Sequence, residues 1–225
     1  MRNIAIFDLD HTLIPIDSDY EWGQFLTRIG AVDADAFARC NADFFAQYQA
    51  GTLDPVEYLE FALGTLAQFS RAQLNDFHTQ FMQEVIQPAL LPVAHELIQK
   101  HQNQGDLIVI ITATNRFVTA PIAQALGVEH LIAAEPEMNN VGELTGKLLG
   151  IPTSGAGKVI HLKQWLANQG TQLSDFPVSY FYSDSQNDIP LLSIVTHPVA
   201  TNPNAKLSAH AITHGWPTLH LFNLQ

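Results

Sequence analysis

Four acidic residues occur as two closely spaced pairs, each directly after a short apolar run. Asp8 and Asp10 follow residues 4–7, and Asp184 and Asp188 follow residues 178–182. Ionised carboxylates a few ångströms apart repel each other, and a divalent cation bound by oxygen ligands relieves that repulsion. The spacing therefore predicts a divalent-cation site. The alternative for the first pair is that both residues cap a turn, as Asp often does.

A lysine follows a Gly-Ala-Gly sequence and opens a helical pattern. Lys158 is the first residue of this pattern, which runs to residue 168. A cation at the start of a helix opposes the helix dipole, so an anionic partner such as the Asp8 carboxylate or a phosphoryl group explains its place. An ordinary surface lysine is the alternative. A nucleotide P-loop is excluded, because Pro152 and Val159 stand where that motif needs Gly and Ser or Thr.

The elements that must position these side chains are short buried strands alternating with helices. Apolar runs predict strands at residues 4–7, 107–111 and 178–182, and helical patterns cover residues 115–126, 158–168 and 186–193. This alternation predicts an α/β fold with a doubly wound, mostly parallel sheet. Ligands of such sheets bind beyond the carboxyl ends of the strands, so Asp8, Thr112 and Asp184 are expected to converge.

Residues 17–88 break this alternation. Their apolar residues recur at helical spacing, which predicts an all-helical insertion, and the aromatic residues among them are expected to pack in its core. The predicted organisation is therefore a core of residues 1–16 and 89–225 with a helical cap of residues 17–88.

Composition limits the compartment and the partners. The 225 residues carry a formal charge of −12 and have no cluster of basic residues, which disfavours nucleic acid and anionic membranes as partners. The single cysteine, Cys40, cannot form an intrachain disulfide, and the chain shows no secretion leader, so we expect a cytoplasmic protein. Cys40 lies in a helical apolar pattern and is predicted to be a small buried residue rather than a nucleophile.

The ordered motifs resemble those of a known enzyme superfamily. Phe7-Asp-Leu-Asp-His-Thr-Leu13 resembles the first motif of the haloacid dehalogenase superfamily, and Thr112, Lys158 and residues 183–188 resemble the other three. The insertion after the first motif is similar to the helical cap of the phosphoserine-phosphatase-like subclass, and Ile111-Thr-Ala-Thr-Asn-Arg116 resembles its phosphoserine- or histidinol-phosphatase-like group. Ser183 departs from the Gly usual in the fourth motif, which leaves the acids in place.

The resemblance implies a magnesium-dependent phosphohydrolase. Asp8 would attack phosphorus and form an aspartyl phosphate, while Asp10 would protonate the leaving alkoxide and later deprotonate the attacking water. Mg²⁺ would be held by Asp8, the backbone carbonyl of Asp10 and Asp184, with Asp188 supporting these ligands.

The resemblance also implies how the phosphoryl group is bound. Thr112 would donate its hydroxyl to a phosphoryl oxygen, aided by backbone N–H groups around Ala113 at the start of the next helix. Asn187 would contact the phosphate, and Lys158 would meet both phosphate and Asp8. We expect Thr114 to cap the helix.

Asp17 falls where the subclass has an acid that meets the substrate amino group. The alternative is a helix-terminal charge beside a capping box formed by Ser18 and Glu21. Eleven acids against three arginines in residues 17–88 favour a small amine-bearing phosphate ester, such as phosphoserine or histidinol phosphate. Candidates for a contact with a substrate carboxylate are Arg28, Arg39 and Arg71.

Other activities fit the residues less well. A dehalogenase of the superfamily lacks the second aspartate, and a signalling receiver domain lacks both the cap and an acid at the place of Asp10. A phosphotransferase or phosphomutase would use the same nucleophile and stays an alternative, as does a noncatalytic phosphate-binding module. The sequence leaves the oligomeric state open.

Overall fold

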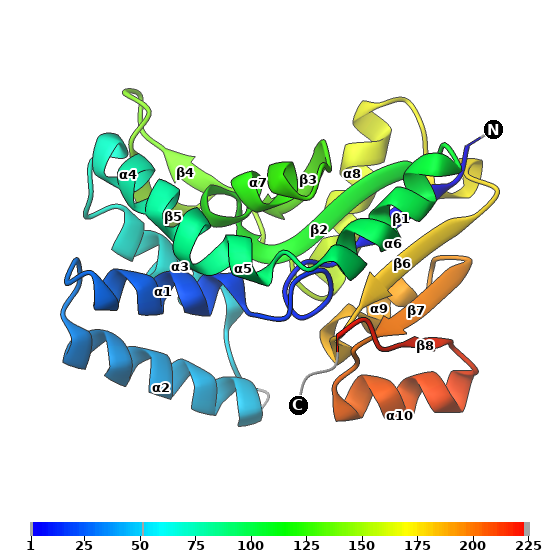
Figure 1. Cartoon of the computed structure of the whole chain (residues 1–225), viewed down its shortest axis with the longest axis horizontal. Helices are drawn as coiled ribbons and strands as arrows, with labels where there is room; N and C mark the ends of the chain where they lie inside the picture. Colours follow the sequence, from blue (N-terminus) through cyan, green and yellow to red (C-terminus); the bar gives the residue numbers. More distant parts are fainter. Residues whose placement is uncertain (1, 51, 223–225) are drawn as a thin grey trace.

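A six-stranded parallel sheet forms the centre of the protein in a computed structural model that describes residues 2–50 and 52–222 (Figure 1). The strand order is β3-β2-β1-β6-β7-β8, and every neighbouring pair is parallel. This confirms the predicted doubly wound sheet. The strands are β1 (Ile4–Phe7), β2 (Leu107–Asn115), β3 (His130–Ala134), β6 (Ser179–Ser183), β7 (His197–Thr201) and β8 (Thr218–Leu219).

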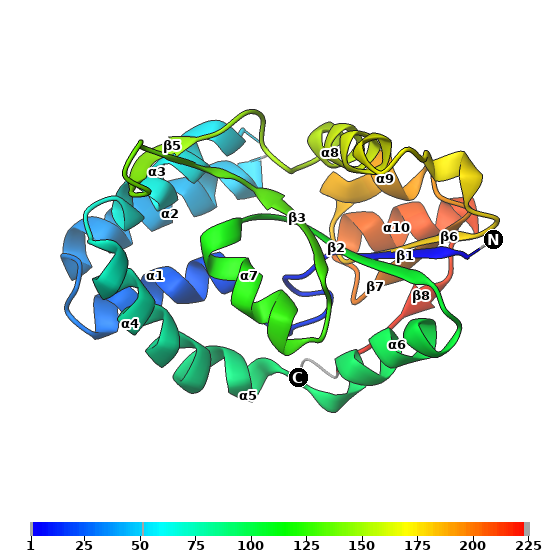
Figure 2. The same ribbon diagram turned by 90° about the horizontal axis from the view of Figure 1, so that it is seen from above.

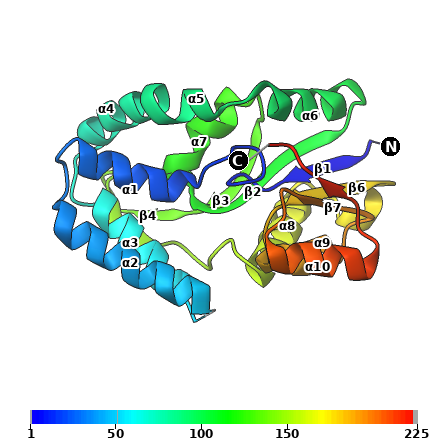
Figure 3. The ribbon, with the colours of Figure 1, turned by 60° about the horizontal axis from the view of Figure 1, so that its bottom comes forward.

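Helices cover both faces of the sheet because successive strand residues point to opposite sides. Ala5 and Phe7 of β1 pack in one apolar cluster, and Ile4 and Ile6 pack in the other. Figure 3 shows α6 and α7 on the first face and α8, α9 and α10 on the second. These helices are α6 (Pro92–Asn103), α7 (Arg116–Ala125), α8 (Ala156–Asn168), α9 (Ile189–Leu192) and α10 (Ala205–His214).

The segment between β1 and α6 is helical, and it lies beyond the carboxyl ends of β1 and β2 (Figures 1 and 2). It comprises α1 (Ser18–Arg28), α2 (Ala34–Ala50), α3 (Pro55–Leu66), α4 (Arg71–Phe81), a π-helical turn η1 (Met82–Ile86) and α5 (Gln87–Ala89). None of the helices in the described residues is long and apolar enough to cross a membrane. The division into a core and a cap at residues 17 and 88 stays a prediction.

A β-hairpin from outside the insertion joins these helices. Strands β4 (Pro136–Met138) and β5 (Leu144–Leu148) are antiparallel, and β5 packs against α3. The contact is close because glycines meet: a Cβ on Gly146 would lie 3.1 Å from the Cα of Gly64. The sequence did not predict this hairpin, because its strands are short and it pairs with no strand of the main sheet.

Two local predictions were wrong. The second strand does not stop before Thr112 but runs to Asn115, where it pairs with Ala134 of β3 after an irregularity in the register. Cys40 is exposed rather than buried, because α2 is an outer helix that turns Phe37 and Phe44 towards Phe61 of α3. Side chains at positions 45, 48, 49 and 50 are outside the described part of this helix.

The packing of α8 on the sheet gives a stability prediction. Leu162→Ala removes a side chain that is 0% exposed and should lower the free energy of unfolding by about 2–5 kcal/mol. Leu149→Ala is the matched control, because Leu149 is 59% exposed and its truncation should change stability by about 0.5 kcal/mol or less. Urea denaturation measures both values, and equal effects of the two substitutions would contradict the assignment of Leu162 to the core.

Candidate active site

Asp8 lies directly after the central strand β1, and each of its carboxylate oxygens has a separate partner. Lys158 Nζ donates to Oδ1 at 2.7 Å, and the Thr12 hydroxyl is 3.2 Å from Oδ2. The carboxylate is almost fully buried, and these two contacts fix its orientation. The contact between Lys158 and Asp8 that the sequence predicted is therefore present.

Lys158 also reaches a second carboxylate. Its Nζ atom donates to Oδ2 of Asp188 at 2.7 Å, and the Ser183 hydroxyl donates to the same oxygen at 2.7 Å. Burial by itself lowers the pKa of Lys158, but the charges of Asp188 and Asp8 and their hydrogen bonds outweigh it and raise the pKa. Lys158 is thus a permanently charged cation that links the turn after β6 to the end of β1.

Asp184 shares a hydroxyl with Asp8. The Thr12 hydroxyl accepts the backbone N–H of Asp184 at 3.1 Å and lies 3.4 Å from Oδ1 of Asp184. Burial raises the pKa of the Asp184 carboxyl to about 8, and the charges of Asp8 and Asp188 add to the rise. The three carboxylates therefore crowd one another around a single lysine.

Asp10 is held by two donors from different parts of the chain. The backbone N–H of Ser18 donates to Oδ1 at 2.8 Å, and the Thr114 hydroxyl donates to Oδ2 at 2.8 Å. Removal of water raises the pKa of the Asp10 carboxyl to about 8, with further rises from the charges of Asp17 and Asp8. The expectation that Thr114 caps a helix is wrong: Asn115 caps α7 through Val118 N–H, and Thr114 binds Asp10 instead.

Asp17 is the N-cap residue of α1. Its Oδ1 atom accepts the backbone N–H groups of Asp19 at 3.0 Å and Tyr20 at 2.9 Å. The cap is therefore Asp17 itself and not the capping box predicted from Ser18 and Glu21. A contact between Asp17 and a substrate stays a prediction.

The predicted phosphate-binding residues lie near these acids but in a different local structure. Thr112 is buried in β2, and its hydroxyl accepts the Thr114 N–H at 3.2 Å. Ala113 is exposed and belongs to the same strand rather than to a helix N-terminus, because β2 extends to residue 115. Asn187 is exposed in the turn after β6. Their contacts with phosphate stay predictions.

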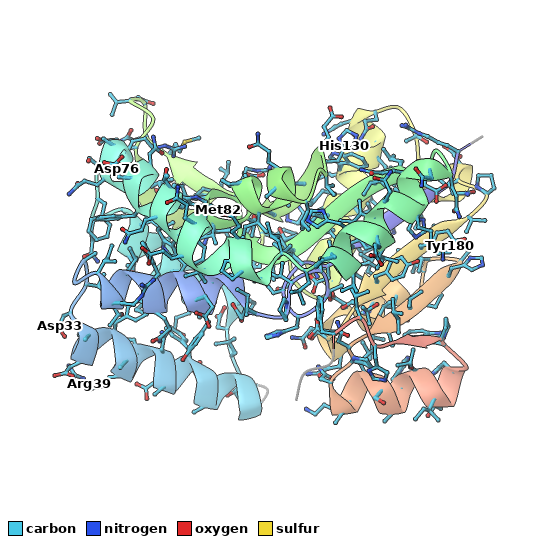
Figure 4. All side chains as sticks on the ribbon, viewed as in Figure 1. Asp33, Arg39, Asp76, Met82, His130 and Tyr180 are labelled. Atoms are coloured by element: carbon cyan, nitrogen blue, oxygen red, sulfur yellow. The ribbon has the colours of Figure 1, made fainter. Side chains whose placement is uncertain are left out.

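Two of the three candidate arginines contact other side chains, and the third lies away from the sheet. Arg28 forms an ion pair with Glu84 at 2.7 Å, and Arg71 lies over the Phe117 ring. Figure 4 shows Arg39 near the outer end of α2, away from the sheet. We find no support for a role of these three side chains at the ends of the strands.

The acids fit a magnesium ion better than a metal held by protein side chains alone. Within the described residues, no group of three or more His, Cys, Asp or Glu side chains could hold a metal ion. The predicted ligands are two carboxylates, from Asp8 and Asp184, and the backbone carbonyl of Asp10. Mg²⁺ typically binds one or two carboxylates and keeps other positions for water or phosphate oxygens. The crowding of Asp8 and Asp184 also favours a cation between them.

Several polar partners in the site were missed from the sequence. Thr12 links Asp8 and Asp184, Ser183 holds Asp188, and Asp19 is buried and accepts a hydrogen bond from Asn115. Thr12 had a signal, because it is the threonine of the first motif. Ser183 and Asp19 had none, since their roles depend on side chains far away in the sequence.

The first turn of α8 packs closely against the backbone of residue 152, and this contact gives a prediction with a matched control of opposite sign. A Cβ on Gly157 would clash with the backbone carbonyl of Pro152, whereas one on Gly64 in α3 would meet nothing within 4 Å. Gly157→Ala should lower the free energy of unfolding by about 1–3 kcal/mol. Gly64→Ala should raise it by about 0.5–1 kcal/mol, because Gly weakens a helix interior. Chemical denaturation tests both substitutions, and a neutral effect of Gly157→Ala would show that the start of α8 and residue 152 can move apart freely.

The site and fold match a family model and known proteins. The model of haloacid dehalogenase-like hydrolases matches residues 5–193. The chain is 43% identical to a histidinol-phosphatase of Neisseria meningitidis serogroup C (strain 8013), over 98% of this chain and 99% of the relative. It is 48% identical to a protein with unknown function from Bordetella pertussis Tohama I, whose crystal structure superposes with a TM-score of 0.95 over 99% of this chain and 100% of that one.

A substrate-bound phosphoserine phosphatase complex shares the fold. Its TM-score is 0.69 at 16% identity, over 97% of this chain and 93% of that chain. The family model spans the strands and turns that hold Asp8, Thr112, Lys158 and Asp184. The chain belongs to the haloacid dehalogenase-like hydrolase family.

Proposed function

We propose that the chain hydrolyses the phosphate ester of a small, amine-bearing metabolite through a phosphorylated Asp8. Its family and its phosphatase relatives make it a phosphoric monoester hydrolase, and the proposal adds the chemical route and the substrate class. The observation that carries the route is the Asp8 carboxylate, which is buried at the end of β1 between Lys158 and Thr12, with Asp10 held separately beside it.

In the first step an oxygen of Asp8 attacks phosphorus, and the bond between phosphorus and the ester oxygen breaks. The Asp10 carboxyl gives its proton to the departing alkoxide, so the alcohol leaves neutral. Hydrogen bonds from Ser18 N–H and the Thr114 hydroxyl support this role because they hold both oxygens of Asp10 in place.

In the second step a water oxygen attacks phosphorus, and the bond between phosphorus and Asp8 breaks. The water proton passes to Asp10, which returns to its starting form, and inorganic phosphate is released. The net reaction consumes one ester and one water. Lys158 supports both steps, because its ammonium group reduces the negative charge that gathers around Asp8.

We propose that Asp8, the carbonyl of Asp10 and Asp184 hold Mg²⁺, supported by Asp188. When bound, the metal supplies positive charge that brings the anionic phosphate to the carboxylate. Thr112 and the backbone near Ala113, in the last part of β2, and Asn187, in the turn after β6, would bind the phosphoryl oxygens, because these strands end at the same edge of the sheet as Asp8.

The substrate class rests on charge and on a relative. Residues 17–88, which we propose as the cap over a core of residues 1–16 and 89–225, contain eleven acids and three arginines, a balance that disfavours polyanionic substrates. The histidinol-phosphatase from Neisseria meningitidis supports histidinol phosphate as the first ester to test. Phosphoserine is the second, and we place the reaction in the cytoplasm.

Asp8→Asn should reduce phosphate release by roughly 10³-fold or more, because an amide does not form the acyl phosphate. The assay uses purified protein with Mg²⁺ and histidinol phosphate, phosphoserine, phosphoethanolamine, a sugar phosphate and p-nitrophenyl phosphate. Asp76→Asn is the control: the same change on the exposed side of α4 (Figure 4) should leave activity unchanged. Full activity of Asp8→Asn would eliminate the covalent route.

Asp10→Asn should separate the two steps with p-nitrophenyl phosphate. The p-nitrophenolate leaves without a proton, so phosphorylation of Asp8 needs no acid, whereas hydrolysis of the aspartyl phosphate still lacks its base. Rapid mixing should give a burst of about one p-nitrophenolate per enzyme and then turnover slowed by about 10²–10⁴-fold. Slow release without any burst would contradict the assignment of Asp10 to water activation.

A further inference from the structure

Two residues near the site have left-handed backbone angles that L-residues rarely adopt. Among the described residues other than glycine, only His11 and Asn202 have positive φ angles, of 56° and 46°. His11 lies between Asp10 and Thr12, and Asn202 directly follows β7. Both angles cost free energy that the surrounding structure must offset, and such outliers gather at functional sites.

A hydrogen bond joins the two strained residues. The side-chain amide of Asn202 donates from Nδ2 to the backbone carbonyl of His11 at 3.0 Å. This carbonyl belongs to the peptide that leads into Thr12, whose hydroxyl contacts Asp8 and Asp184. The bond therefore holds the backbone on which the place of Thr12 depends, and it favours the strained angle at His11.

The oxygen of the Asn202 amide is fixed by the segment after β8. Oδ1 accepts the backbone N–H groups of Leu221 at 2.7 Å and Phe222 at 3.1 Å. Phe222 is buried, and Leu221 packs against the apolar cluster that contains Leu13 of the loop after β1. Because Oδ1 has two donors, the amide cannot flip without losing both bonds, and Nδ2 stays directed at His11.

The turn that begins at Asn202 also contacts the turn after β6. The backbone N–H of Asn204 donates to the carbonyl of Asp184 at 2.8 Å, and the Asn204 side chain caps α10. Residues 202–204 thus contact two of the loops that carry the acids of the site. This turn supplies no group to the reaction steps above, so its contacts indicate a supporting role.

We propose that Asn202 is a positioning residue: its amide keeps His11 in the left-handed conformation that sets Asp10 and Thr12 in place. This inference rests on the proposed function, in which Asp10 transfers protons and Thr12 holds the nucleophile Asp8. Without the amide, His11 relaxes towards a negative φ angle, and the peptides on either side turn with it. The fraction of enzyme with the active loop then falls, and kcat/KM falls in proportion.

The experiment measures kcat/KM for p-nitrophenyl phosphate and histidinol phosphate in a double-mutant cycle of residues 11 and 202. Asn202→Gly removes the amide but keeps a residue that adopts a positive φ angle freely. It should lower kcat/KM about 5- to 30-fold, the factor that matches the usual cost of a left-handed L-residue. His11→Gly keeps the carbonyl and removes the strain, so its kcat/KM should stay within about threefold of wild type.

The decisive variant combines the two substitutions. In the His11→Gly background the loop stores no strain, so Asn202→Gly should lower kcat/KM less than about threefold. A role of Asn202 in holding only the segment after β8 predicts the same loss in both backgrounds. Asn202→Asp separates the two contacts, because it keeps the acceptor for Leu221 and Phe222 but has no N–H for His11. Alone, it should lose at least as much activity as Asn202→Gly.

The matched control is Asn140→Gly, the same change in the exposed turn between β4 and β5, which should alter kcat/KM in neither background. Four results would overturn the role of Asn202 while the phosphohydrolase stands: equal losses of Asn202→Gly in both backgrounds, no loss, full activity of Asn202→Asp, or a large loss from His11→Gly alone. No hydrolysis by wild type would overturn both. Thermal unfolding shows whether Asn202→Gly is folded, and Asn202→Asp replaces it in both backgrounds if it is not.

Discussion

The ion pair between Lys158 and two buried carboxylates is the interaction on which the rest of the site depends. Lys158 Nζ lies 2.7 Å from both Asp8 and Asp188, and all three side chains are almost fully buried. A buried charge that loses its partner costs several kcal/mol, whereas the complete group is tolerated. The end of β1, the first turn of α8 and the turn after β6 are therefore fixed relative to one another by one ammonium group.

One lysine cannot neutralise all the acids that gather at this edge of the sheet. Asp8 and Asp188 share Lys158, while Asp184, Asp10 and Asp19 have pKa values raised by burial. The crowding is greatest around Asp8 and Asp184, where burial and the charges of the neighbouring carboxylates raise the pKa of Asp184.

The sequence predicts those parts of the fold and the site that the local pattern of residues determines. Residues 4–7 form the first strand as predicted, and Asp8 and Asp184 meet because parallel strands end at one edge. The end of β2 could not be predicted, because Thr114 and Asn115 are positioned by pairing with β3 and by Asp10 and Asp19. The burial of Asp19 was hidden for the same reason: an acid in the first turn of a helix normally indicates only a favourable helix charge.

The hydrogen bonds of Asp10 tie the start of α1 to the end of β2. One oxygen of Asp10 is bound by Thr114 of β2, and the other by the backbone N–H of Ser18, the first residue of α1. This N–H belongs to the unpaired donors of a helix N-terminus, so it needs an acceptor wherever α1 lies. Asp10 provides that acceptor only when α1 sits against the end of the sheet. The start of α1 therefore also sets the orientation of the Asp10 carboxyl, so the helix and this acid are positioned together.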